Sequence, residues 1–137
     1  MNKQYVMDNF SLEGRKAIVT GAAQGIGRSI AEALHDAGAI VALVDYSASV
    51  KETARQMDET GKSVLPFQAD LSKREEIDRV FSEVMQAFDG HIDILVNNAG
   101  ITRRHKPEEF PREDWDAVIN VNMNAVWFLS QLAGQIM

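Results

Sequence analysis

Three glycines within seven residues constrain this chain most strongly: Gly21, Gly25 and Gly27 lie between a short apolar run and a long amphipathic segment. Residues 16–20, Lys-Ala-Ile-Val-Thr, have the length and β-branched character of a strand. Residues 26–37 have the spacing of a helix, and Gly38 stands just past its end. Glycines allow a tight turn, so the segment predicts a strand, a turn and a helix in immediate succession.

The same alternation continues along the chain. Further strands are predicted over 40–44, 64–68 and 94–96, and a second helix over 47–60, closed by Gly61. A third helix is expected from Ser72 as N-cap, with Glu75 as its capping-box partner. Residues 112–137 are expected to be largely helical, with a break near Asn120. Alternating strands and helices indicate an α/β fold, a Rossmann-type doubly wound parallel sheet with strand order 3-2-1-4.

Composition narrows the classes of protein that fit. The 137 residues suit one domain, and the net charge of −6 argues against nucleic acid or an anionic membrane surface as partner. Cysteine is absent and the three histidines stand singly, so neither a disulfide nor a metal site is expected. The longest apolar run, 39–44, cannot span a bilayer, and residues 1–14 lack a signal-peptide core. A cytoplasmic location is the default expectation.

The glycine turn and the acid after the second strand predict a nucleotide site. A helix beginning at such a turn offers free N–H groups and a positive dipole end to a pyrophosphate. Asp45 ends the second strand, where a carboxylate can bind the adenosine ribose hydroxyls and repel a 2′-phosphate. Because Gln24 is neutral and the first cation after Asp45 is Lys51, NAD is favoured over NADP. The alternatives are a turn that only packs helix against strand, and an Asp45 that only caps a helix.

Four motifs in order make the sequence similar to a known family. The turn reads T-G-x-x-x-G-x-G over 20–27, Asp70-Leu71 follows the third strand, Asn97-Asn98-Ala99-Gly100 follows the fourth, and Asn120-Val121-Asn122 lies in the last helix. Together they resemble the short-chain dehydrogenase/reductase family over essentially the whole chain. That resemblance implies a nicotinamide-dependent oxidoreductase.

The resemblance implies roles for individual residues. Asp70 and Leu71 would hold the adenine edge, and Asn97 and Asn98 would run beside the cofactor and brace the end of the sheet. Asn122 matches the catalytic asparagine, whose backbone holds a water in the proton relay; a polar residue in a helix break is its simpler interpretation. The residues that would line the pyrophosphate are Gly21, Gln24, Gly25, Ile26 and Gly27.

A narrower resemblance concerns the substrate. The run Gly100-Ile101-Thr102-Arg103-Arg104-His105, with Glu109-Phe110-Pro111 downstream, is similar to gluconate 5-dehydrogenases and partly to deoxygluconate dehydrogenases. Arg103 or Arg104, just past the fourth strand, could clamp a sugar-acid carboxylate with two hydrogen bonds. An ordinary solvated loop is the alternative. A 3-oxoacyl carrier-protein reductase shares the general motifs; Asp45 and the Arg103-Arg104 pair argue against it, and that reductase usually takes NADPH.

The family's catalytic tyrosine, with a lysine four residues on, has no match here. Tyr5 is followed four residues later by Asn9, and Tyr46 by Val50. The catalytic segment is therefore expected beyond Met137, which makes residues 1–137 the NAD(P)-binding half of an enzyme and inactive alone. The full-length enzyme is expected to be a homodimer or homotetramer. A non-catalytic nucleotide-binding module is the alternative of another class, and the coding sequence past Met137 would distinguish the two.

Overall fold

The computed structural model describes residues 2–137, and its centre is a four-stranded parallel sheet. The strands are β1 (Lys16–Thr20), β2 (Ile40–Asp45), β3 (Val64–Gln68) and β4 (Ile94–Val96). They lie in the order β3-β2-β1-β4, which confirms the predicted Rossmann-type topology. β4 stands at one edge of the sheet and its residues are half-buried.

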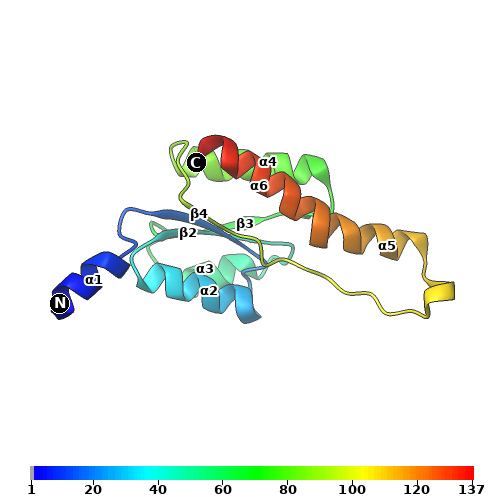
Figure 1. Ribbon diagram of the computed structural model, residues 1–137, viewed down its shortest axis with the longest axis horizontal. Coiled ribbons are helices and arrows are strands. Elements are labelled where there is room, and N and C mark those ends of the chain that lie inside the picture. The colour runs from blue at the N-terminus through cyan, green and yellow to red at the C-terminus, as the bar shows by residue number, and fades with distance from the viewer. Residues whose placement is uncertain (1) are drawn as a thin grey trace.

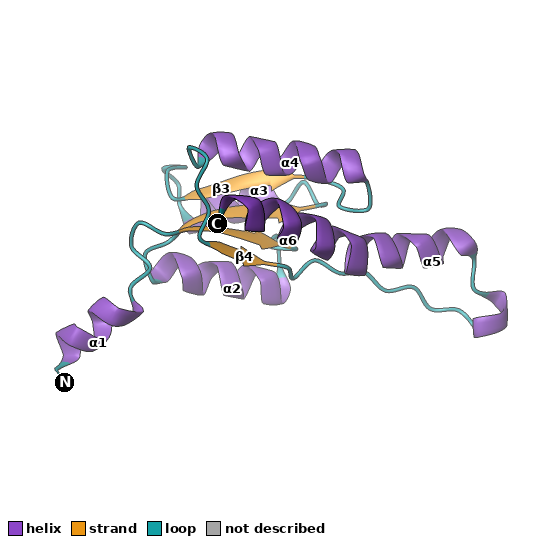
Figure 2. Ribbon diagram, turned by 45° about the horizontal axis from the view of Figure 1, so that its top comes forward, coloured by secondary structure: helices purple, strands orange, loops and turns teal. Residues whose placement is uncertain are grey.

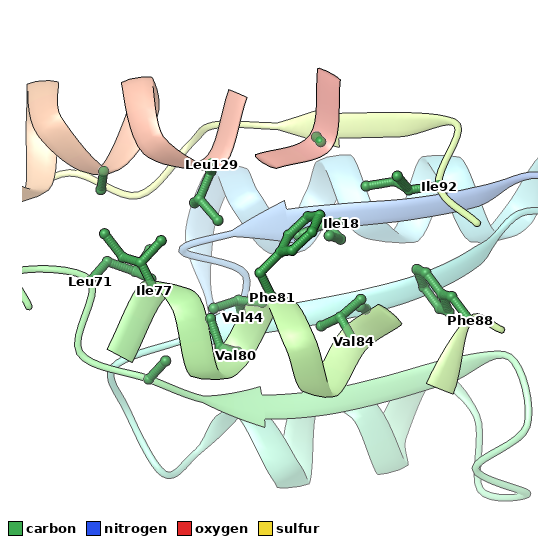
Figure 3. Packing of buried hydrophobic residues seen from close by; sticks show 14 residues of the cluster. Ile18, Val44, Leu71, Ile77, Val80, Phe81, Val84, Phe88, Ile92 and Leu129 are labelled. Atoms are coloured by element: carbon green, nitrogen blue, oxygen red, sulfur yellow. The ribbon is translucent and has the colours of Figure 1, made fainter. Parts of the chain in front are cut away.

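Helices cover both faces of the sheet, as a parallel sheet requires (Figures 1 and 2). On one face lie α2 (Gly25–Asp36) and α3 (Val50–Met57). On the other lie α4 (Arg74–Ala87) and α6 (Ala125–Ile136), which contact each other. Two apolar clusters result, and the larger joins β1 and β2 to α4 and α6 through residues such as Ile18, Phe81 and Leu129 (Figure 3).

Two segments extend away from this sandwich at opposite ends of the molecule (Figure 1). The first is α1 (Lys3–Phe10), a helix with no buried residue that the sequence analysis did not anticipate. The second is an arm of residues 101–119. It contains an irregular segment, the short 3-10 turn η1 (Pro107–Glu109) and the helix α5 (Arg112–Ile119). α5 continues through the π-helical turn η2 (Asn120–Asn124) into α6, so the predicted break near Asn120 is a local widening of one continuous helix.

Both predicted boundaries of the second helix are wrong, and an aspartate explains each. The second helix begins at Val50 rather than Ser47, because Asp45 Oδ1 accepts the Ser47 N–H (2.9 Å) and holds the chain in a turn. The helix ends at Met57, four residues before Gly61, because Asp58 accepts the N–H groups of Lys62 and Ser63 in a tight loop.

The third helix begins at Arg74, so the predicted capping box of Ser72 and Glu75 does not form. The hydroxyl of Ser72 donates instead to Asp70 Oδ1 (2.6 Å), and the N–H of Ser72 donates to the same oxygen (3.0 Å). The acidic side chain that bonds a backbone group ahead of the helix is Glu76 rather than Glu75, since its Oε1 accepts the Asp70 N–H (3.4 Å). Hydrogen bonds from Arg79 and from that N–H lower the pKa of Glu76.

No helix among residues 2–137 has both the length and the apolar character needed to cross a bilayer.

Candidate functional site

The strand register brings four loops to one edge of the sheet. Thr20 pairs with Val44, Val19 pairs with Val96, and Asp45 pairs with Gln68, so the carboxyl ends of all four strands meet there. A cavity of about 590 Å³ opens at this edge, within the usual range for small-molecule sites. Its walls come from the turn after β1, from the loops after β2, β3 and β4, and from α5 and η2.

The three glycines of the turn play different structural parts. Gly21 has a positive φ of 65°, and a Cβ there would lie 2.9 Å from the Cα of Ala99. Gly25 also has a positive φ, 62°, but has open space beside it and lines the cavity together with Gly21 and Gln24. Gly27 is buried, and a Cβ there would overlap the carbonyl oxygen of Gly21. Gly21 and Gly25 therefore shape the cavity wall, and Gly27 lets α2 pack on the turn.

The first turn of α2 adjoins the cavity. Gln24 is its N-cap residue and makes no side-chain capping bond, so α2 leaves N–H groups free where Gln24 and Gly25 line the wall. Ile26 does not line the cavity, although the residue is 75% exposed. Of the five residues predicted to line a pyrophosphate, three therefore line the cavity and two, the exposed Ile26 and the buried Gly27, do not.

Asp45 is held in one orientation at the end of β2. Its Oδ2 accepts the Ala23 N–H (2.9 Å) and its Oδ1 accepts the Ser47 N–H (2.9 Å). A carboxylate has about four acceptor positions, so two remain for a ligand in the cavity that Asp45 lines. Asp45 is not the N-cap residue of α3, because Ser49 holds that position.

Asp70 and Leu71 line the cavity beyond β3. Asp70 is fixed by its two bonds to Ser72, described above, and Leu71 is buried against the larger apolar cluster.

Asn98 links the loop after β4 to the glycine turn. Its Nδ2 donates to the carbonyl oxygens of Thr20 (3.1 Å) and Gly21 (3.2 Å). Thr20 completes the link, since its hydroxyl oxygen accepts the N–H groups of Asn98 and Ala99, both at 3.0 Å. Sequence reasoning missed this part played by Thr20; its signal is a polar residue at the end of an otherwise apolar strand. Asn98 and Ala99 line the cavity, whereas Asn97 turns away and donates to the Ser130 hydroxyl (3.1 Å).

Asn122 lies in η2 and holds the start of the arm. Its Oδ1 accepts the Ile101 N–H (2.8 Å), and its Nδ2 donates to the Ile101 carbonyl oxygen (2.9 Å). A π-helical turn leaves backbone groups without the usual helical partners, and such turns often mark functional sites.

The two arginines of the arm differ in their placement. Arg103 lines the cavity and pairs loosely with Asp114, with 3.7 Å between Nε and Oδ1. Arg104 is exposed, does not line the cavity, and makes no ion pair with any of residues 2–137. One cavity thus joins the turn, Asp45 and a single arginine. Within that described part of the chain, no three His, Asp or Glu side chains gather where they could hold a metal ion.

Comparison with known proteins places this geometry in a family. The family model described as short chain dehydrogenase matches residues 15–137. The 2-dehydro-3-deoxy-D-gluconate 5-dehydrogenase of Bacillus subtilis (strain 168) is 44% identical over 133 residues, which are 97% of this chain and 52% of that protein. The chain spans about half the length of the curated relatives it matches.

Solved structures show the same relationship. A gluconate 5-dehydrogenase from Burkholderia cenocepacia J2315, in complex with NADP and tartrate, is 34% identical, with a TM-score of 0.82 over 95% of this chain and 51% of that one. A 3-ketoacyl-(acyl-carrier-protein) reductase from Brucella melitensis, complexed with NADH, is 33% identical, with a TM-score of 0.80 over 88% of this chain and 49% of that one. The chain belongs to the short-chain dehydrogenase/reductase family.

Proposed function

We propose that the protein carrying this chain transfers a hydride between a nicotinamide cofactor and a sugar acid, in the manner of a gluconate 5-dehydrogenase, and that residues 1–137 are its cofactor-binding half. The observation that supports this most is the single cavity that joins the glycine turn and Asp45 to Arg103. Bound nicotinamide would supply or accept the hydride.

The cavity wall offers backbone N–H groups and carboxylates at positions that suit a dinucleotide. Gly21, Gln24 and Gly25, with the free N–H groups of α2, would bind the pyrophosphate, and no side chain obstructs the approach at Gly25. Asp45 would bind the ribose hydroxyls, and Asp70 and Leu71 the adenine. Ile26 and Gly27 would contribute by shaping the turn.

The asparagines would contribute to the site in two ways. Asn98, and behind it Asn97, would keep the end of β4 beside the cofactor. Asn122 would act as the catalytic asparagine, presenting a backbone group of η2 to a water of the proton relay while its side chain holds Ile101.

For the cofactor we propose NAD in preference to NADP. The reason is Asp45: its carboxylate would be repelled by a 2′-phosphate, and its two backbone bonds prevent it from turning away. The Burkholderia relative was solved with NADP and the Brucella relative with NADH, so the family accommodates both cofactors.

For the substrate we propose a sugar acid whose carboxylate pairs with Arg103. The Bacillus relative favours a second candidate within the same chemistry, a 2-dehydro-3-deoxygluconate. A 3-oxoacyl carrier-protein reductase stays an alternative because of the Brucella relative, although Arg103 in the cavity wall suits a carboxylate better than a thioester.

We also propose that the full-length protein is a homodimer or homotetramer. Trp115, Met123 and Trp127 are each more than half exposed along α5, η2 and α6, and an apolar row of this kind is typical of a subunit contact. Size-exclusion chromatography with light scattering on the full-length protein would test this.

The deciding experiment is an assay of the full-length protein in both directions: with NAD and with NADP over gluconate, 2-dehydro-3-deoxygluconate and uncharged polyols, and with NADH and with NADPH over a 3-oxoacyl thioester. We expect turnover of a sugar acid with NAD. Turnover of the thioester alone would favour the reductase. A stop codon directly after Met137, together with nucleotide binding and no turnover, would favour the non-catalytic module.

A further inference from the structure

Arg103 lies between two fixed points of a segment that has no helix or strand of its own. Residues 101–106 are irregular. At one end, Asn122 bonds both backbone groups of Ile101 (2.8 and 2.9 Å). At the other end, His105 Nε2 and Asp114 Oδ2 are 2.6 Å apart. The position of Arg103 at the cavity therefore depends on side chains that hold the segment from either side.

Asp114 serves two residues of this segment at once. Its Oδ2 bonds His105, and its Oδ1 lies 3.7 Å from Arg103 Nε. The His105 ring is held in turn by an edge-on contact with Phe110, with centroids 5.0 Å apart, and Phe110 makes a similar contact with Trp115 at 6.3 Å. The Asp114 side chain is only 31% exposed, so this arrangement is partly shielded from water.

The contacts of Arg103 leave part of its guanidinium available. Nη1 donates to the Thr102 carbonyl oxygen (2.9 Å), and Nε faces Asp114. Nη2 has no hydrogen-bond partner among residues 2–137, while Arg103 itself lines the cavity. A guanidinium held from one side in this way can offer its free N–H groups to an anion on the other side.

We propose that Asp114 is a positioning residue for substrate recognition: with His105 it holds the arm so that Arg103 presents its free N–H groups to a substrate carboxylate in the cavity. This rests on the proposed function, in which Arg103 binds that carboxylate. Asp114 does not itself touch the substrate in this arrangement.

The proposal predicts that removing Asp114 changes the affinity for the substrate in the direction opposite to that expected from its charge alone. Asp114 is a negative charge beside an anion-binding arginine, so removing that charge alone would strengthen the binding of an anionic substrate. If Asp114 positions Arg103, its removal weakens that binding instead, because the guanidinium is no longer directed at the carboxylate.

The experiment compares Asp114→Asn with Glu113→Gln in the full-length protein. Glu113 is an exposed neighbour on α5 and forms no ion pair within residues 2–137. Its variant therefore removes the same charge but leaves the contacts of Asp114 with His105 and Arg103 in place. For Asp114→Asn we expect KM for the sugar acid to rise by about threefold to tenfold, with kcat and KM for the cofactor little changed. Glu113→Gln should leave all three parameters near wild type.

Two further variants keep the outcome decisive. His105→Ala should raise KM for the sugar acid as Asp114→Asn does, and it replaces that variant if Asp114→Asn does not fold. Arg103→Ala combined with Asp114→Asn should be no worse than Arg103→Ala alone, since both act through one guanidinium.

A sugar-acid KM that is unchanged or lowered in both Asp114→Asn and His105→Ala would overturn the proposal, as would a loss confined to kcat. Failure of the proposed function would look different: Arg103→Ala would then leave sugar-acid KM unchanged, or the wild type would not turn over sugar acids.

Discussion

Gly27→Ala should loosen the junction between the glycine turn and α2. The added Cβ would overlap the Gly21 carbonyl oxygen and lie 2.5 Å from Asn98 Nδ2 and 2.8 Å from the Gly21 carbonyl carbon. Two of these three atoms are backbone, so no side-chain rotation can relieve the overlap. Either α2 or the turn must move, and the bond from Asn98 Nδ2 to the Gly21 oxygen (3.2 Å) would be lost.

The magnitude follows from three contributions. Overpacking of a well-filled site costs about 1–3 kcal/mol. Loss of the Asn98 bond costs about 1 kcal/mol more. Alanine in place of glycine within a helix returns about 1 kcal/mol, because alanine has the higher helix propensity. The net loss in the free energy of unfolding is therefore about 2 kcal/mol, and nucleotide binding should weaken because the moved turn lines the cavity.

The assay is urea unfolding of the full-length protein, with nucleotide binding measured in parallel. The matched control is Gly134→Ala, also within a helix, where a Cβ meets nothing within 4 Å and the backbone conformation needs no glycine. That variant should be more stable than wild type by up to about 1 kcal/mol. If Gly27→Ala proved as stable as wild type and bound nucleotide equally well, the close packing of the turn on α2 would be refuted.

Four other outcomes are expected. Asp45→Ala should lower kcat/KM for NAD and narrow the preference for NAD over NADP in steady-state kinetics. An equal or higher kcat/KM for NADP in the wild type would contradict the proposed preference for NAD. The double variant Arg103→Ala, Arg104→Ala should raise KM for sugar acids by about tenfold or more, the value of a charge-assisted hydrogen bond, with little change for uncharged polyols. Hydrogen bonds from Thr60 and Ser63 hold the pKa of Asp58 well below its usual range. The stabilising effect of the Asp58 carboxylate is therefore present above about pH 4 and lost as the pH falls through the lowered folded-state pKa. The difference in Tm between wild type and Asp58→Asn should therefore shrink on acidification. Residues 1–137 expressed alone should be inactive and should self-associate in light scattering, because β4 is an edge strand and Trp127 is 65% exposed. A stable monomer or measurable turnover would contradict this.

The sheet could be predicted from the sequence because its signals are local. Each strand is a short apolar run bounded by turn residues, and the strands of a buried parallel sheet need no more than that. The start of β1 at Lys16 and the strand order both followed from this pattern and from the right-handed crossover rule.

The errors in helix boundaries share one physical origin. Asp45, Asp58 and Asp70 each accept N–H groups from the residues that follow them, and those bonds compete with the first or last turn of a helix. A capping-box pattern such as Ser72 with Glu75 does not reveal that an aspartate two residues earlier will take the serine hydroxyl. Identifying the competitor requires knowing where β3 ends.

The candidate site divides in the same way into a part that local sequence reveals and a part that it does not. The glycine turn, Asp45 and Asp70 reach the cavity because strand register carries them there, and register follows from the apolar pattern. Arg103 reaches it by another route, because the segment around it is held by contacts with residues further along the chain. The bond between His105 and Asp114 spans 9 positions of the sequence, and the bond between Ile101 and Asn122 spans 21. No local pattern encodes such bonds. Substitutions in the arm should therefore alter how the substrate binds while nucleotide binding persists, and substitutions at the strand ends should alter nucleotide binding first.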